Sequence, residues 1–235
     1  MGKPLADMDV ILFAALPYVA LVTFFIGTIK RYVDQEFTYS SLSSQFLENK
    51  KHFWALVPFH YGIITIIAGH VIGLLIPREV LLWNSQPLRL YVLEVAALMG
   101  GIFTLVGMLF IIERRLSDSK IRVVTTVTDW IVYGLLLLQI ASGLYVAIFH
   151  PWGSSWFATS ATPYIWSIFK MSPQINYVQA MPFFVKLHIV NAWLLIGFFP
   201  FSRLVHILVV PNQYLWRRTQ VVRWYGNWRA ARVRD

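Results

Sequence analysis

The stretch FWALVPFHYGIITIIAGHVIGLLI, residues 53–76, carries no charged side chain and contains two histidines, His60 and His70. A helix needs about 20 consecutive apolar residues to cross the hydrocarbon core of a bilayer. The stretch is therefore long enough to span a membrane. Because an ionisable side chain inside such a span is rare and usually functional, these histidines are the first candidate site residues.

Four further stretches have the same apolar character. They cover residues 10–29, 90–112, 130–149 and 183–210. The connections between them are too short to form an independent globular domain. The sequence therefore predicts an all-α integral membrane protein of five transmembrane helices, which forms a single domain over residues 1–235.

The composition agrees with a membrane protein. Hydrophobic residues make up 57% of the chain and charged residues 13%, whereas soluble domains have about 45–50% and 25%. The net charge of +9 would suit nucleic acid only if it were clustered on a soluble face, so no nucleic acid is expected. The absence of cysteine excludes disulfides, thiolate-bound iron–sulfur clusters and thiolate zinc sites.

The distribution of basic residues predicts the orientation. They gather between the first and second spans, between the third and fourth spans, and in the tail at residues 211–235. Short cytoplasmic connections carry the excess of Lys and Arg in membrane proteins. We therefore expect a multi-pass protein of the cell (cytoplasmic) membrane with its N-terminus outside and its C-terminus in the cytoplasm. The basic tail is expected to attract membrane lipid or to dock a cytoplasmic subunit.

Four histidines lie inside spans, at two depths. His60 and His70 are in the second span, and His188 and His206 are in the fifth, which runs the opposite way. Counting 1.5 Å per residue puts His70 and His188 about 8–9 Å from the outer ends of their spans. His60 and His206 lie about 6–10 Å from the inner ends. Two such pairs suit the axial ligands of two b-type haems. Structural histidines that bond neighbouring helices are the alternative interpretation.

The spacing of these histidines agrees only in part with that pairing. His188 and His206 are 18 residues apart, which is five full turns and about 27 Å on a continuous helix. His60 and His70 are ten residues apart, which is about 15 Å and roughly 80° off one face. Helix tilt, crossing and a bend at Pro200 would have to absorb this difference.

Basic residues near the inner pair are candidates for contacts to haem propionates. Arg203 lies one turn before His206, and Arg114 and Arg115 lie on the same side of the membrane. Guanidinium groups bind carboxylates through strong paired hydrogen bonds. The alternative is that Arg114 and Arg115 are ordinary positive-inside residues.

Small and acidic residues near the histidines add further candidates. Gly62, Gly69 and Gly73 border the histidines of the second span and are expected to leave room for a flat macrocycle. Glu94 in the third span is a candidate acceptor for a quinol proton. The aromatic segment at residues 151–182 is expected either to cover the outer site or to lie plainly at the membrane interface.

Four segments resemble the gamma subunit of membrane-bound respiratory nitrate reductase. They are SSQFLENKK (43–51), FHYGIITIIAGHVIGLLIP (59–77), ERRLSDSKIRVVTTVTD (113–129) and FVKLHIVNAWLLIGFFPFSRLVHILVVPNQYL (184–215). The resemblance covers nearly the whole chain, including the number of spans and the topology. It implies a dihaem cytochrome b that oxidises quinol and passes electrons to an iron–sulfur beta subunit, which supplies a molybdenum alpha subunit where nitrate is reduced.

The resemblance also implies roles for single residues. His70 and His188 match the ligands of the family's distal haem, and His60 and His206 match those of the proximal haem. The quinol site of the family lies near the distal haem and includes the residues matching Gly69 and His70, together with a basic residue after the second span. Arg89 is the candidate for that basic residue here.

Two other functions stay open at this point. The first is the cytochrome b subunit of a heterodisulfide-reductase-like complex of sulfur metabolism, which would keep the haems and change the partners. The second is a transporter or channel with a histidine proton relay, but the spans lack the inverted repeat and the acid pairs that such a protein is expected to have.

Overall fold

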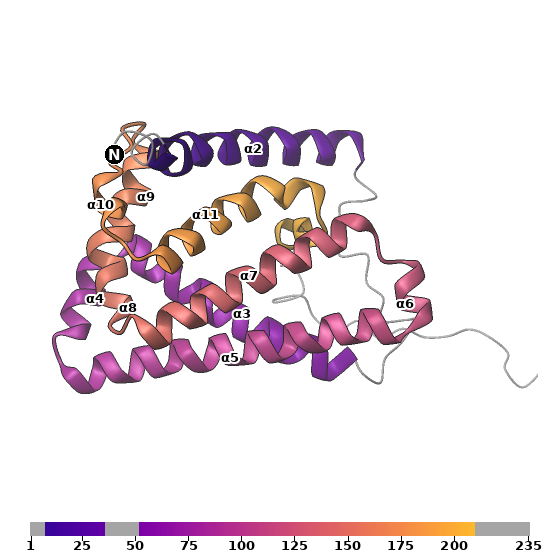
Figure 1. Ribbon diagram of the computed structural model, residues 1–235, viewed down its shortest axis with the longest axis horizontal. Coiled ribbons are helices and arrows are strands. Elements are labelled where there is room, and N and C mark those ends of the chain that lie inside the picture. Colours follow the sequence, from indigo (N-terminus) through magenta and orange to yellow (C-terminus); the bar gives the residue numbers. More distant parts are fainter. Residues whose placement is uncertain (1–7, 36–51, 210–235) are drawn as a thin grey trace, which may run out of the picture.

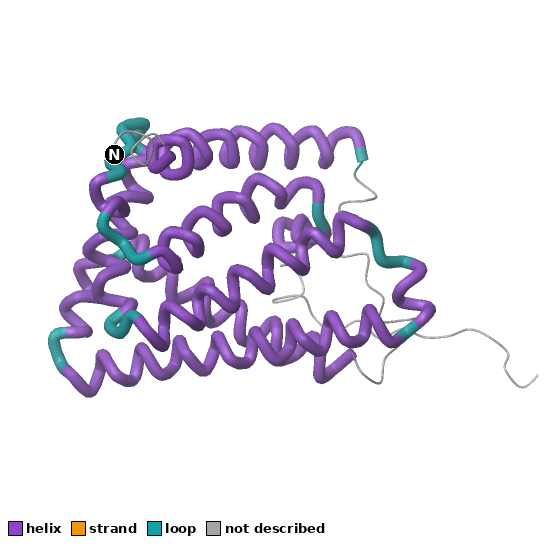
Figure 2. The backbone as a smooth tube through the Cα atoms, viewed as in Figure 1, coloured by secondary structure: helices purple, strands orange, loops and turns teal. Residues whose placement is uncertain are grey.

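A computed structural model describes residues 8–35 and 52–209 of the chain (Figure 1). This part consists of helices and short connections and contains no strand (Figure 2). Five helices in it are long and apolar enough to cross a membrane: Met8–Asp34, Phe53–Leu75, Pro87–Ser117, Val127–Phe149 and Phe183–Phe201. The expected all-α architecture with five spans is thus confirmed. The predicted basic tail lies outside the described residues.

The long helices follow the apolar stretches closely. They are α2 (Leu16–Asp34, which continues from the π-helical turn η1, Ile11–Ala15), α3 (His52–Leu75), α5 (Pro87–Ser117), α7 (Val127–Phe149) and α11 (Phe183–Phe198). Short helices connect them: α4 (Pro77–Asn84), α6 (Ser119–Val123), α8 (Gly153–Trp156), η3 (Phe157–Ala161), α9 (Thr162–Phe169) and α10 (Asn176–Gln179).

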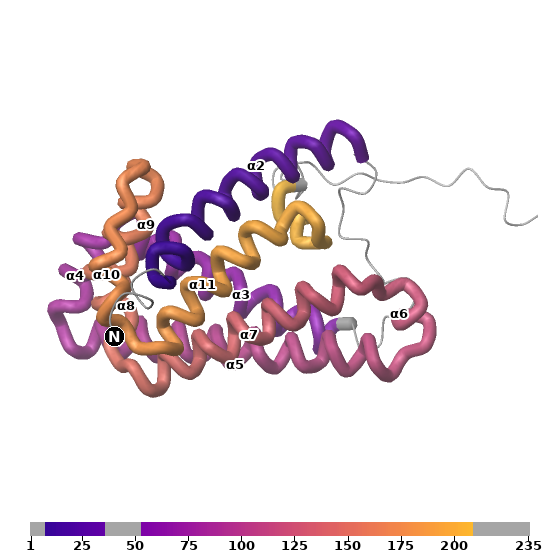
Figure 3. The backbone as a smooth tube through the Cα atoms, turned by 45° about the horizontal axis from the view of Figure 1, so that its top comes forward, coloured from indigo at the N-terminus to yellow at the C-terminus, as the bar shows by residue number. Residues whose placement is uncertain are grey.

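The order in space differs from the order in sequence. α3 packs on α5, α5 on α7, α7 on α11, and α11 on α2. Figures 1 and 3 show α4, α8, α9 and α10 at one end of the bundle, which we call the α9 end, and α6 at the opposite end, which we call the α6 end. The orientation expected from the basic residues puts the α9 end outside and the α6 end in the cytoplasm.

Local sequence explains where several helices begin. α4 begins at Pro77 and α5 at Pro87, since proline needs no hydrogen-bond partner for its nitrogen in a first turn. α7 begins with a capping box, in which the Thr126 hydroxyl and the Asp129 carboxylate each accept from the other residue's backbone N–H. The Asp118 side chain caps α6.

The outward surface of the long helices is apolar. Phe25 and Ile26 on α2 are 57% and 63% exposed, and Leu109 on α5 is 51% exposed. Contiguous apolar surface of this kind is rare on soluble monomers and suits contact with lipid tails. Together with the five long apolar helices, it describes a multi-pass membrane protein.

A small buried core ties the α9 end together. Phe13, Tyr164, Ile168, Val178 and Trp193 pack into one cluster there. The Tyr164 hydroxyl donates to the Phe13 carbonyl oxygen at 2.9 Å. Burial raises the pKa of Tyr164, so the phenol stays protonated and keeps this donor. The core therefore fixes α9 against the beginning of the first span.

The fifth span is not continuous over residues 183–210, and it breaks at Pro200, where the histidine spacing predicts a bend. α11 ends at Phe198, a 3₁₀ turn η4 covers Phe199–Phe201, and a second 3₁₀ helix η5 covers Arg203–Val209. Between these turns, Ser202 is extended, with φ −115° and ψ 175°. Pro200 explains the interruption, because its ring lacks an N–H and clashes with the carbonyl four residues before it. His188 and His206 therefore do not share one straight helix.

Candidate functional site: two histidine pairs

The first histidine pair lies nearer the α9 end. His70 comes from α3 and His188 from α11, and their ring centres are 6.3 Å apart with an angle of 31° between the ring planes. The ring of Phe157, in η3, lies edge-on to His70 at 5.2 Å. Helices that are distant in sequence thus bring one pair of imidazoles together.

The second pair joins α3 to the 3₁₀ helix η5. The ring centres of His60 and His206 are 6.4 Å apart, and the ring planes make an angle of 68°. The two pairs are therefore almost equally spaced. They are the same two pairs that the depth of each histidine predicts from the sequence.

Backbone contacts fix the tautomer of three of these histidines. Nδ1–H donates to a carbonyl oxygen in each: His60 to Leu56 at 2.8 Å, His70 to Ile66 at 2.9 Å and His206 to Arg203 at 2.7 Å. A carbonyl oxygen accepts only, so Nδ1 must carry the proton. In the neutral ring of this tautomer Nε2 carries the lone pair, which is the state needed to bind a metal.

His188 is oriented by side chains of α7 instead. Its Nδ1 lies 3.0 Å from the Ser142 hydroxyl oxygen, which itself donates to the Leu138 carbonyl at 2.7 Å. The Gln139 amide nitrogen lies 3.0 Å from Nε2. Since the Ser142 proton is already used, its oxygen accepts from Nδ1–H, and Nε2 again holds the lone pair. Asn191 donates to the Gln139 side-chain oxygen at 2.7 Å and completes this polar group.

The spacing of the pairs suits one metal ion between two imidazoles. Two metal–imidazole bonds of about 2 Å, with roughly 1.1 Å from each nitrogen to its ring centre, give a separation of about 6.2 Å. Within the described ranges, no group of three or more His, Cys, Asp or Glu side chains is placed to hold a metal ion. The arrangement therefore favours a group that brings its own equatorial ligands, such as haem, over a tetrahedral zinc site.

The glycines of α3 divide into two kinds. A Cβ on Gly62 would clash with Thr104 and the Gly100 carbonyl of α5, and one on Gly73 would lie 2.9 Å from the Phe157 ring. These two glycines serve close packing and leave no open space, contrary to the expectation from sequence. Gly69, next to His70, has no neighbour within 4 Å of such a Cβ and does face open space.

The candidate quinol-site residues come from two different helices. Gly69 and His70 are on α3, whereas Arg89 is exposed at the beginning of α5. The Arg89 guanidinium lies over the Trp83 ring at 5.2 Å, and the Trp83 indole N–H donates to the Arg89 carbonyl at 3.2 Å. Arg89 is thus held by stacking at the end of the bundle that carries His70.

Glu94, the candidate proton acceptor, has a structural task. One oxygen of its carboxylate accepts from the Ser154 backbone N–H at 2.9 Å and from the Ser154 hydroxyl at 2.6 Å. The Asn84 amide donates to the same hydroxyl oxygen at 2.9 Å. Glu94 therefore joins α5 to the first turn of α8.

The segment at residues 151–182 packs on the end of α3. The Thr162 hydroxyl donates to the Gly73 carbonyl at 3.1 Å, and the Trp166 indole N–H donates to the Leu74 carbonyl at 3.0 Å. Phe157 of this segment lies edge-on to His70, while His70 itself is exposed.

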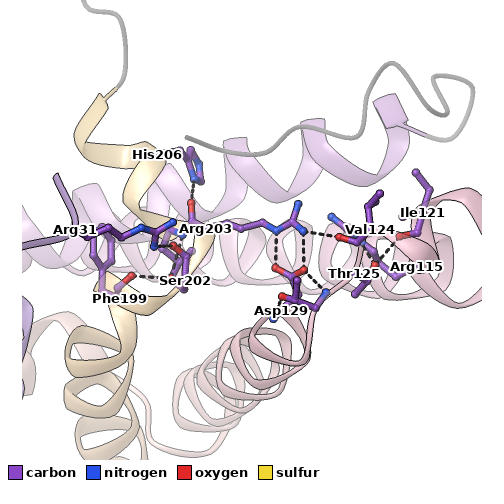
Figure 4. A network of polar contacts seen from close by, with 12 residues as sticks. Arg31, Arg115, Ile121, Val124, Thr125, Asp129, Phe199, Ser202, Arg203 and His206 are labelled. Carbon is purple, nitrogen blue, oxygen red and sulfur yellow. Dashed lines mark hydrogen bonds and ion pairs between the residues drawn. The ribbon is translucent and has the colours of Figure 1, made fainter. Parts of the chain in front are cut away.

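The basic residues near the second pair are bound to protein groups. Arg203 forms a bidentate ion pair with Asp129 (Nε–Oδ1 2.5 Å, Nη2–Oδ2 2.7 Å) (Figure 4). Arg115 donates to the Thr125 hydroxyl at 2.9 Å and lies over the Tyr133 ring at 5.8 Å. Arg114 and Arg115 are 4% and 7% exposed, which is unusual for positive-inside residues that only face water.

The site residues predicted from the sequence do not include Ser142, Gln139 or Asp129. A signal for each was present, because they are polar residues in or beside an otherwise apolar span, and such residues usually bond a neighbouring helix. Asp129 is 4% exposed, and a carboxylate at that depth requires a cationic partner. The identity of the partner depended on the fold.

Comparison with known proteins agrees with these features. A family model described as the nitrate reductase gamma subunit matches residues 9–225. The chain is 32% identical over 216 residues to the nitrate reductase gamma chain of Bacillus subtilis, covering 91% of this chain and 97% of that one. It is 32% identical over 220 residues to the respiratory nitrate reductase 1 gamma chain of Escherichia coli, covering 92% and 97%. The respiratory nitrate reductase 2 gamma chain of the same organism is 31% identical over 222 residues, covering 92% and 97%.

Proposed function

The chain belongs to the nitrate reductase gamma subunit family, and on this basis we propose that it is the quinol-oxidising cytochrome b subunit of a membrane-bound nitrate reductase. In this function it takes two electrons from quinol at the outer side of the cytoplasmic membrane. It delivers them to an iron–sulfur beta subunit on the inner side, which supplies a molybdenum alpha subunit where nitrate is reduced.

The observation that carries the proposal is the equal spacing of two imidazole pairs, 6.3 Å and 6.4 Å, in one apolar bundle. Two b haems, bound between His70 and His188 and between His60 and His206, would supply one-electron redox chemistry. All four histidines keep Nε2 as an acceptor, as such ligands must. The open space beside Gly69 supports a flat group at the first pair.

The chain's own residues would bind quinol at the α9 end. Gly69 and His70 form the inner wall of this candidate site, and Arg89 is the candidate cation for a quinol oxygen. Segment 151–182 contributes Phe157, whose ring lies against His70, to the wall of this candidate site. Oxidation of one quinol gives one quinone, two electrons and two protons, and release of the protons on the outer side would charge the membrane.

The inner end would serve the partner subunits. Arg203, Arg114 and Arg115 are the candidate contacts for the propionates of the group held by His60 and His206. With the C-terminus in the cytoplasm, this end faces the compartment of the beta and alpha subunits. The basic side chains of that end also suit anionic lipid headgroups.

The test is the haem content of the complex purified gently from membranes. We expect two b-type haems per chain by the pyridine haemochrome assay, together with the beta and alpha subunits. His70→Ala and His188→Ala should each remove the same one haem, and His60→Ala and His206→Ala should each remove the other. A wild-type chain without b-type haem would contradict the function. If the two variants of one pair removed different haems, the ligand assignment would be contradicted.

A further inference from the structure

The break in the fifth span explains how histidines with different spacings along their helices can form two pairs. His60 and His70 are ten residues apart on continuous α3, which separates them by about 15 Å along the axis. His188 and His206 are 18 residues apart, and a continuous helix would separate them by about 27 Å. Both pairs nevertheless have ring centres within 6.4 Å. The interruption at residues 199–203 ends α11 before His206, so η5 need not continue along the axis of α11 and His206 can meet His60.

Such a break exposes carbonyl oxygens that the helix no longer binds. An unsatisfied carbonyl at this depth costs several kcal/mol in a membrane, so it needs a donor. Arg31, in the last turn of α2, donates from Nη1 to the carbonyls of Pro200 and Ser202, each at 2.7 Å (Figure 4). The Ser202 hydroxyl donates to the Phe199 carbonyl at 2.8 Å. These contacts hold the break in one conformation.

Arg203 links the break to the beginning of α7. Its guanidinium binds both oxygens of Asp129, and Nη2 also donates to the Val124 carbonyl at 2.9 Å. Asp129 is fixed in turn, since its carboxylate accepts from the Thr126 backbone N–H at 2.8 Å in the capping box of α7. A buried pair of this geometry holds two elements in one relative position.

The same residue also orients the histidine. The carbonyl oxygen of Arg203 accepts from His206 Nδ1–H at 2.7 Å (Figure 4). The side chain of Arg203 is thus tied to α7 while its backbone sets the imidazole of His206. Contacts of this kind, behind a metal-binding histidine, fix the ring orientation and its basicity.

We propose that Asp129 is a positioning residue for the inner haem site: through Arg203 it holds η5 so that the His206 ring faces His60. This inference rests on the proposed function, because it concerns the group held by that pair. Asp129 is an acid, so it repels a propionate and does not bind one. Its effect on the inner site therefore has to pass through Arg203 and His206.

The experiment compares two carboxylate-to-amide variants in the whole complex in its membrane. Asp129→Asn removes the charge of the buried pair and keeps the shape of the side chain. Asp9→Asn is the matched control, since Asp9 forms the ion pair with Lys186 (3.4 Å) at the other end of the bundle. Haem per chain and the midpoint potential of each haem are measured, and His206→Ala identifies the signal of the inner haem.

We expect Asp129→Asn to halve the haem content by loss of the inner haem, or to shift the potential of that haem alone. Asp9→Asn should leave both haems as in the wild type. The inference would be overturned if Asp129→Asn kept two haems with unchanged potentials. It would also be overturned if both haems decreased together, in proportion to a decrease in the amount of chain. The haem content of the wild type tests the proposed function by itself. Failure of the proposed function is therefore distinguishable from failure of the role proposed for Asp129.

Discussion

The hydroxyl oxygen of Ser142 lies 3.0 Å from Nδ1 of His188. In the other three histidines of the two pairs, Nδ1 contacts a backbone carbonyl oxygen. In the described part of the chain, His188 is the member of the pairs whose Nδ1 contacts a side chain instead. A backbone carbonyl cannot be removed by substitution, whereas a hydroxyl can. The basicity of His188 is therefore open to a direct test.

Ser142→Ala should raise the midpoint potential of the haem held by His70 and His188. Loss of the acceptor makes the imidazole a weaker electron donor to ferric iron. A hydrogen bond contributes about 0.5–1.5 kcal/mol, which corresponds to a rise of roughly 20–60 mV for a one-electron couple. Redox titration followed at the b-haem bands measures it.

Ser167→Ala provides the control for that titration. Ser167 is also buried, but its hydroxyl donates to the Tyr164 carbonyl at 2.6 Å within α9. Both potentials should stay at the wild-type values in this variant. An unchanged pair of potentials in Ser142→Ala would show that the hydroxyl does not tune His188.

Gly143→Ala should disturb the same histidine by contact. A Cβ at this position would lie 2.9 Å from Cε1 of His188, closer than carbon atoms approach without a shift. We expect loss of the outer haem or a changed low-spin spectrum, with the inner haem intact. Gly134→Ala on the same helix is the control, since a Cβ there has no neighbour within 4 Å. Equal spectra for the two variants would contradict the packing of Gly143 on His188.

Gly62→Ala should weaken the packing of α3 on α5. The added methyl group would meet Thr104 and the Gly100 carbonyl, and overpacking of this kind destabilises by about 1–3 kcal/mol. A fall in unfolding temperature of roughly 2–4 °C for each kcal/mol follows. Gly100→Ala, at the same interface, would make only ordinary contacts of 3.4 Å and longer, so it should unfold near the wild-type temperature. Thermal unfolding of the purified complex in detergent distinguishes the two variants, and equal stability would refute this role of Gly62.

Arg89→Ala should weaken quinol binding without loss of haem. A hydrogen bond to a charged group contributes about 1.5–3 kcal/mol, so we expect the KM for quinol to rise roughly tenfold or more. Arg78→Ala is the control, because Arg78 is an exposed arginine of the neighbouring helix α4. Steady-state quinol oxidation by the complex gives both values. An unchanged KM in Arg89→Ala would remove Arg89 from the quinol site.

Part of this architecture could be predicted from the sequence and part could not. The five spans followed from uninterrupted apolar stretches such as residues 53–76, and the partners of each histidine followed from its depth. The fifth apolar stretch is not one continuous helix: hydropathy continues past Pro200, but α11 ends at Phe198, next to the residue where the histidine spacing predicts a bend. The sequence predicts open space for a cofactor beside Gly62 and Gly73. In the structure, residues of α5 and η3 fill that space.

The sequence by itself determined which segments lie in the membrane and which histidines they carry, because both properties depend on residues that are consecutive in the chain. Only the tertiary structure decided that Asp129 binds Arg203, that Ser142 binds His188, and that the fifth span breaks where Arg31 meets it. These contacts join residues that are far apart in sequence. Their geometry follows from how helices pack, which no local pattern of residues encodes.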